Sequence, residues 1–258
     1  MAIKITVSNH KGGIGKTTTA INLATGLALK KKKVLLIDTE IQCNSTRVYD
    51  AKIDDTATIA DMLYNGTLAE ECIQHTNLGD IIASDPALKN ADTQIPVDVD
   101  RFYHLKDACK NLDDMYDYII CDTPPGNGVI LGNVLAYVDY IIIPVTCDAF
   151  GIQGLHDFAT TVNSFKERIN NDLSIAGILK VMYKGRRKLT RDIEDDILPE
   201  LAKNMDTKIF KTCIRDSVKC QEAQTVRRSL YEYAPKCNTA IDYSEFIKEL
   251  SNTIRRKK

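Results

Sequence analysis

The sequence has no tryptophan and almost no net charge: its formal charge is -1 over 258 residues. Because a chain this close to neutral is not a polycation, any nucleic-acid binding has to come from local basic patches. No apolar run approaches the roughly 18 residues that span a membrane. The apolar run 3–7 is too short for a signal peptide and leads directly into a polar loop. We therefore expect a soluble, cytoplasmic protein.

Paired cysteines are missing as well. None of the eight cysteines belongs to a C-x-x-C pair, which argues against a zinc site or a disulfide framework and favours reduced, packed thiols. The chain also has no internal repeat and no low-complexity linker. With 44% hydrophobic residues, the chain can bury a large core, and we expect one α/β domain over residues 1–258.

A glycine-rich loop is the strongest signal that is present. Residues 8–19 read SNHKGGIGKTTT and lie between the apolar run 3–7 and a pattern with helical spacing. A strand, such a loop and a helix N-terminus in this order form a phosphate cradle, since glycine lets backbone N–H groups turn onto an anion. A chance glycine loop is the weaker alternative. The predicted nucleotide-binding residues of this loop are Gly12, Gly13, Ile14, Gly15, Lys16, Thr17 and Thr18.

Acidic residues follow two apolar runs that we expect to be strands. Asp38 and Glu40 come directly after the run 34–37, and Asp122 ends the run 116–122 ahead of a proline–glycine loop. Ligands of α/β folds bind at the carboxyl ends of parallel strands. Thr17 can offer its hydroxyl to Mg²⁺, and an aspartate after a strand can accept hydrogen bonds from water on the metal. We predict a Mg²⁺ site from Thr17, Asp38 and Asp122.

Three segments together resemble the ParA/MinD family of ATPases. KGGIGKTT, residues 11–18, resembles the family's deviant Walker A box, with His10 where an ordinary P-loop has its first glycine. DTEIQCNST, residues 38–46, is similar to its switch I, and DYIICDTPP, residues 117–125, to its Walker B motif. The resemblance runs from Ile3 to about Leu250. It implies a P-loop NTPase fold with a mostly parallel, twisted central sheet and helices on both faces.

The resemblance also implies catalytic roles and cofactors. Lys16 would serve the nucleotide of its own chain, whereas Lys11 would cross to that of a partner, so that ATP and Mg²⁺ join two chains in a sandwich dimer. Glu40 takes the place of the family's water-orienting aspartate, with a solvated loop acid as the alternative. The catalytic set is then Lys11, Lys16, Asp38 and Glu40, and ATP is hydrolysed to ADP, slowly without a partner protein.

Further roles follow from the second half of the chain. Met182 would lie near the adenine, and Arg215 belongs to a segment, IRDS, that stands where the family has I-P-R-N beside the base. Asp148 and Phe150 are candidates for the dimer interface, with core packing an equal alternative for Phe150. His10 is expected to be a packing residue of the loop.

Basic residues are concentrated after the expected strand 175–183. Lys219 matches a position with which family members touch the DNA backbone, and such phosphate contacts give sequence-independent, salt-sensitive affinity. A solvated charged face is the alternative for each residue. The predicted DNA-binding set is Lys184, Arg186, Arg187, Lys188, Arg191, Lys219, Arg227 and Arg228, the last two one or two helical turns after Lys219.

The resemblance is closest to the short ParA/Soj-type partition ATPases. It implies a nucleoid-associated ATPase whose ATP dimer binds double-stranded DNA non-specifically and is stimulated by a ParB-like centromere-binding protein. Two alternatives remain open. The apolar stripe of the last helix, 241–254, would suit a MinD-like membrane-positioning ATPase, although we expect this helix to pack on the domain and no stable membrane association. Glu40 leaves room for a nucleotide-dependent adaptor that hydrolyses poorly.

The remaining elements are predicted from apolar periodicity alone. We expect helices after Lys16 and over 56–65, 99–112, 151–170 and 241–254. Strands are expected over 3–7, 34–37, 80–83, 116–122, 141–146, 175–183 and 207–214.

Overall fold

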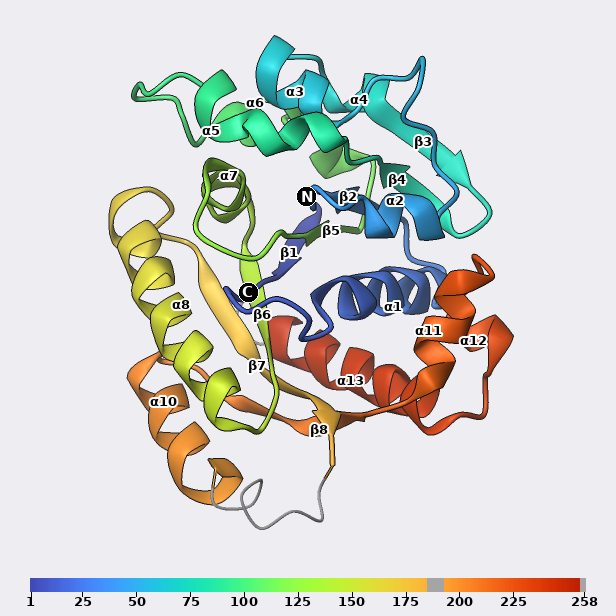
Figure 1. The fold of residues 1–258 in the computed structure, drawn as a ribbon, viewed down its shortest axis with the longest axis vertical. Helices are drawn as coiled ribbons and strands as arrows, with labels where there is room; N and C mark the ends of the chain where they lie inside the picture. The colour runs from blue at the N-terminus through green and yellow to red at the C-terminus, as the bar shows by residue number, and fades with distance from the viewer. Residues whose placement is uncertain (185–192, 256–258) are drawn as a thin grey trace.

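The computed structural model describes residues 1–184 and 193–255, which form an eight-stranded sheet with helices on both faces (Figure 1). The strand order is β3-β4-β2-β5-β1-β6-β7-β8. The pair β3–β4 is antiparallel, and the other neighbouring pairs are parallel. The predicted fold class is thus confirmed. The strands are β1 (Ile3–Val7), β2 (Val34–Asp38), β3 (Ile73–Thr76), β4 (Gly79–Ile82), β5 (Tyr118–Asp122), β6 (Tyr140–Val145), β7 (Ser174–Tyr183) and β8 (Ile209–Arg215).

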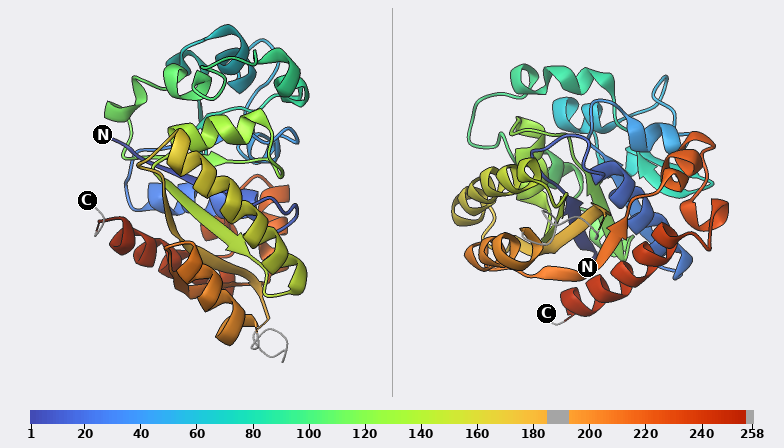
Figure 2. Two further views of the ribbon diagram at one scale, coloured as in Figure 1. Left: turned by 90° about the vertical axis from the view of Figure 1, so that its left-hand side faces the viewer. Right: turned by 60° about the horizontal axis from the view of Figure 1, so that its bottom comes forward.

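Helices lie on both faces of the sheet (Figure 2), and beneath them each face buries one apolar cluster. One face is covered by α1 (Lys16–Leu29), α2 (Asn44–Val48), α11 (Val218–Thr225), α12 (Leu230–Tyr233) and α13 (Asn238–Arg255). The other face is covered by α3 (Ile59–Asn65), α4 (Ala69–Cys72), α5 (Ala91–Gln94), α6 (His104–Ala108), α7 (Val129–Tyr137), α8 (Ala149–Arg168) and α10 (Leu198–Asn204). The central strands are therefore buried on both sides, as their continuous apolar sequences predict.

The order of the central strands positions the site. Strands β2, β5 and β1 are neighbours, and Asp122 is in register with Asp38 on one side and with Val7 on the other. Because adjacent strands lie about 4.8 Å apart, the two aspartates and the start of the glycine loop meet at one edge of the sheet.

The last helix packs on the domain, as expected. On α13 the side chains of Tyr243, Phe246, Ile247 and Leu250 are buried in the cluster shared with α1. The apolar stripe that suggested a lipid-binding helix is therefore already covered by the protein. Within residues 1–184 and 193–255, none of the helices combines the length and the apolar character needed to cross a bilayer. All eight cysteines are free in the structure, and five of them are buried: Cys43, Cys72, Cys109, Cys121 and Cys220.

Some predicted elements differ from the structure. The expected helix 99–112 is reduced to α6, because residues 99–103 form turns. We expected Arg227 and Arg228 to lie on the helix that carries Lys219. That helix, α11, ends at Thr225, and Arg227 has a left-handed backbone with φ 53°, so both arginines lie beyond the helix. Helix α7 was not predicted, since it is buried all round and has no amphipathic period.

Candidate nucleotide site

The glycine loop has the backbone that a phosphate cradle requires. Gly13 and Gly15 have φ values of 73° and 78°, in the left-handed region that residues with a Cβ adopt only under strain. Gly15 is also the N-cap of α1, so the free N–H groups of the first turn face the loop. The loop therefore presents backbone donors and a positive helix end toward the same space.

Lys16 is held inside this space. Its side chain is buried, and its Nζ donates a hydrogen bond to the backbone oxygen of Lys11 at 2.9 Å. Burial lowers the pKa of the Lys16 ammonium, whereas the charges of Asp122 and Glu40 raise it. A negatively charged ligand would stabilise the charged form of Lys16 in the same way as Asp122 and Glu40 do, which makes Lys16 a suitable phosphate-binding cation.

Asp38 and Asp122 form a buried pair. Asp38 Oδ2 accepts hydrogen bonds from the backbone and the hydroxyl of Thr46, both at 2.8 Å, and Asp122 Oδ2 accepts one from Ser45 Oγ at 2.8 Å. Burial raises the pKa of both carboxyl groups, and the neighbouring charge of Asp38 adds to the rise for Asp122. Two carboxylates are thus kept in an environment that favours a shared proton or a cation.

The pair fits a hydrated Mg²⁺ ion. Asp122 Oδ1 is buried and has no hydrogen-bond partner among the described residues. The Thr17 side chain approaches the same carboxyl and lowers its pKa. A water molecule on a cation would satisfy Oδ1, and the cation would offset both negative charges. Thr17 and Asp122, supported by Asp38, are the residues that would hold the metal.

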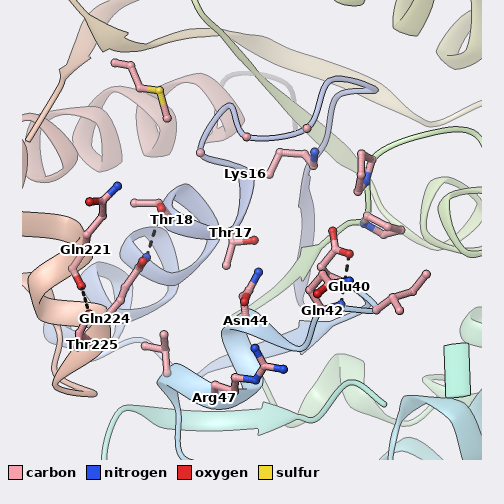
Figure 3. A pocket seen from close by; sticks show the side chains of 18 residues that line it. Lys16, Thr17, Thr18, Glu40, Gln42, Asn44, Arg47, Gln221, Gln224 and Thr225 are labelled. Atoms are coloured by element: carbon pink, nitrogen blue, oxygen red, sulfur yellow. Dashed lines mark hydrogen bonds between the residues drawn. The ribbon is translucent and has the colours of Figure 1, made fainter. Parts of the chain in front are cut away.

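Glu40 borders the cavity beside Lys16 (Figure 3). Its backbone N–H donates to Asp38 Oδ1 at 3.0 Å, and its Oε1 accepts a hydrogen bond from the backbone of Gln42 at 3.4 Å. Burial raises the pKa of the Glu40 carboxyl, and the Lys16 ammonium opposes the rise. Glu40 is thus anchored to the buried pair at its backbone while its carboxylate faces the cavity.

Lys11 points away from the cavity. Its Nζ lies 3.2 Å from Asp148 Oδ1, 3.3 Å from Thr146 Oγ1 and 5.8 Å from the ring centre of Phe150. Asp148 Oδ1 also accepts the backbone N–H of Gly151 and so caps α8. The two expected interface residues therefore surround Lys11, and Phe150 is 79% exposed rather than packed in the core.

His10 packs within the protein as expected. Its ring lies edge-on to Phe158 at 5.1 Å between centroids, and burial lowers the pKa of the imidazole. It contributes to the loop's support and has no place in the cavity lining.

The cavity has a volume of about 870 Å³ and extends well beyond the loop. The predicted residues Gly12, Gly13, Gly15, Lys16, Thr17, Thr18, Glu40 and Met182 line it. Ile14 is buried beneath the loop, with 2% of its surface exposed. The predicted site residues left out several that line the cavity: Asn44 and Arg47 on α2, and Gln221, Gln224 and Thr225 on α11. Asn44 belongs to the switch I-like segment 38–46, which was a signal for it, whereas the others had no motif to mark them as site residues.

A smaller hollow adjoins the cavity at Met182. It is lined by Arg215 and Ser217, among others, and shares Gly15, Thr18 and Gln221 with the main cavity. The Arg215 guanidinium is engaged by Asp242, which it contacts at 2.6 and 2.9 Å, and this pairing raises the Arg215 pKa. Arg215 thus lines the predicted base region mainly as part of an ion pair.

The predicted DNA-binding cations that the structure describes all have acidic partners. Lys184 pairs with Asp216 at 2.9 Å, Lys219 with Glu222 at 2.7 Å, Arg228 with Glu232 at 3.9 Å, and Arg227 with Asp50. Exposed pairs are worth at most about 1 kcal/mol and can be exchanged for phosphate. The other members of the set, Arg186, Arg187, Lys188 and Arg191, lie outside the described residues.

The fold and the site together define a P-loop nucleotide-binding protein with a second, outward lysine in its loop. A family model described as an AAA domain matches residues 2–175. The chain is 31% identical to the chromosome partitioning protein ParA of Myxococcus xanthus, over 95% of this chain and 87% of that protein. It is 32% identical to the sporulation initiation inhibitor protein Soj of Bacillus subtilis, over 96% of this chain and 97% of that protein. The chain therefore belongs to the ParA/Soj family of ATPases.

A solved structure agrees with the fold over the whole chain. It bears the name cobyrinic acid a,c-diamide synthase from Mycobacterium smegmatis and contains ADP and magnesium. It is 25% identical to this chain, has a TM-score of 0.84, and the match covers 100% of this chain and 97% of that one.

Proposed function

We propose that this protein is a DNA-partition ATPase that binds ATP or ADP with Mg²⁺ and hydrolyses ATP. The observation that carries the proposal is that the glycine loop and Glu40 line one cavity, while the buried pair Asp38–Asp122 is bonded to two residues of that lining, Glu40 and Thr17. Membership of the ParA/Soj family and the ADP and magnesium in the Mycobacterium smegmatis structure support the choice of ligand.

In the proposed reaction, water attacks the γ-phosphate in line with the leaving ADP. The backbone N–H groups of the loop and Lys16 hold the β- and γ-phosphates and stabilise the negative charge that develops. Glu40 orients the attacking water from the side of the buried pair. Mg²⁺, held through Thr17 and Asp122, would supply further neutralisation of the phosphate charge.

We further propose that ATP joins two chains. Lys11 lies on the outer side of the loop, with Asp148 and the exposed Phe150 around it, where a second chain could approach. Two chains in one rigid body would present twice the number of basic side chains to DNA, which raises avidity without new contacts. A ParB-like partner would then stimulate ATP hydrolysis, and the dimer would release the DNA of the nucleoid.

Sizing by light scattering with and without Mg²⁺-ATP tests this function. The wild type is expected to double in mass with ATP, Lys11→Ala to remain single, and Glu40→Ala to remain paired for longer because hydrolysis is slowed. A wild type that binds ATP and stays single would refute the dimer. Phosphate release measured with DNA and a partner present separates an ATPase from a nucleotide-dependent adaptor.

No membrane-positioning role is proposed. That alternative depended on the apolar stripe of α13, which is packed against α1 and β8.

A further inference from the structure

Helix α2 has two faces with different contacts. On its buried face, Ser45 donates to Asp122 and Thr46 donates to Asp38. On its open face, Asn44 and Arg47 lie one turn apart and line the cavity. In Figure 3 both side chains extend from α2 on the side of the cavity opposite the glycine loop. The helix thus connects the buried carboxylate pair with the cavity.

The Arg47 guanidinium is exposed and forms no hydrogen bond or ion pair within residues 1–184 and 193–255. Its natural partner would be Asp50, three residues later and close to the end of the same helix. Asp50 is instead engaged by Arg227, from the loop after α11. Asp50 is therefore contacted by Arg227 and not by Arg47, and the Arg47 guanidinium faces the cavity without an acidic partner among the described residues.

The α11 side of the cavity offers Arg47 no acid among the described lining residues. Helix α11 contributes Gln221, Gln224 and Thr225, which are uncharged. The charged residues among the described lining are Lys16, Arg47 and Glu40, two cations against one acid. A cavity with this balance favours an anionic ligand, and a guanidinium presents its donors in a fork that matches phosphate oxygens.

We propose that Arg47 binds the phosphate chain of the nucleotide, as a positioning residue on the wall opposite the glycine loop. The inference rests on the proposed function, since it concerns the same ligand. Ser45 and Thr46 donate hydrogen bonds to the two aspartates, and Arg47 is the next residue on the same helix. A phosphate bound by Arg47 would therefore position α2 between the nucleotide and the carboxylate pair.

Calorimetric titration of Mg²⁺-ADP and Mg²⁺-ATP into the full chain tests this role. Arg47→Gln is expected to bind both nucleotides about ten- to hundredfold more weakly, as for a lost hydrogen bond to a charged group. Arg47→Lys keeps the charge without the fork and should recover part of the loss. Arg168→Gln is the matched control: it removes the same charge from the exposed end of α8, outside the cavity lining.

The outcomes separate this inference from the proposed function. If the wild type and Arg168→Gln bind nucleotide but Arg47→Gln binds within twofold of them, the role of Arg47 is wrong and nucleotide binding stands. If the wild type binds neither nucleotide, the proposed function fails first. Unchanged nucleotide affinity with weaker DNA retention by Arg47→Gln would also overturn the inference, by assigning Arg47 to another interface. Matching thermal melts verify that each variant is folded.

Discussion

The buried pair Asp38–Asp122 should make the nucleotide-free protein less stable as the pH rises. Burial raises the pKa of Asp38 from an ordinary 3.8 to about 6, and the pKa of Asp122 is raised further, to about 8. An acid whose pKa is higher in the folded state holds its proton more tightly there than in the unfolded chain. The stability that this tighter proton binding contributes is therefore fully present below about pH 4, and it is lost as the pH rises through the pKa of the carboxyl group in the folded state.

The size of the stability change can be worked out from Asp38, which has the smaller of the two pKa changes. Raising the Asp38 pKa from 3.8 to about 6 corresponds to about 3 kcal/mol of unfolding free energy. We expect a loss of this order from Asp38 between about pH 4 and pH 6, and a further loss from Asp122 up to about pH 8. Asp122→Asn keeps a side chain that can bond Ser45 but removes the titration of Asp122, whereas the burial that raises the Asp38 pKa remains. Its profile should therefore keep the Asp38 loss and lose the further loss at higher pH.

Urea denaturation at a series of pH values, without nucleotide or Mg²⁺, measures this effect. The difference between wild type and Asp122→Asn cancels the titration of groups common to both, such as His10, whose pKa is lowered by burial. Added Mg²⁺-ADP should reduce the slope of the wild type, because a bound cation offsets the two charges. Parallel profiles for the two proteins would refute the reasoning, since Asp122 would then make no contribution to the slope.

Three further predictions concern the loop, the reaction and the core. Asp148→Asn keeps an N-cap for α8 but weakens the hold on Lys11, so the ATP concentration for half-maximal dimerisation should fall about two- to fivefold in light scattering; a rise would show that Asp148 is needed in the dimer. Glu40→Gln should retain ADP affinity within twofold while phosphate release falls at least tenfold, and unchanged release would exclude Glu40 as the water-orienting group. Gly26→Ala should cost about 1–3 kcal/mol in urea denaturation, because the added methyl overlaps the side chains of Ile247 and Tyr231, which are both packed against α1; an unchanged midpoint would mean that these side chains give way without loss of stability.

The cradle and the carboxylate pair could be predicted because local sequence determines them. Gly13 and Gly15 are needed for a backbone turn within the loop itself, and Asp38 and Asp122 each follow a strand that parallel packing brings to the same edge. The strands themselves were readable because they are continuously apolar. Where an element had no period, as in α7, or was broken by turns, as before α6, the prediction was missing or too long.

The outer part of the cavity could not be predicted in the same way. Arg47 has no ion-pair partner in the part of the chain that the structure describes, and the nearby Asp50 is contacted by Arg227, 177 residues beyond it in sequence. Arg215 is committed to Asp242, 27 residues away. Such pairings depend on which loops the fold brings together, and no periodicity in one segment reports them. The same holds for Gln221, Gln224 and Thr225, which face the cavity only because α11 packs beside α1.

The two walls of the cavity are tied to different parts of the protein, and this bears on how a nucleotide could act on the whole molecule. On one wall, Lys11 is held by Asp148, so the loop is connected to the start of α8 and to the exposed Phe150. On the other, α2 is held by the buried aspartates through Ser45 and Thr46. A nucleotide that binds the loop, the metal residues and α2 is therefore connected to two other parts of the protein. Through Lys11 it is connected to the surface proposed for a second chain, and through α2 to the carboxylate pair. Because the sheet behind them is buried on both faces, we expect binding and release of the γ-phosphate to move these short segments and to leave the sheet in place.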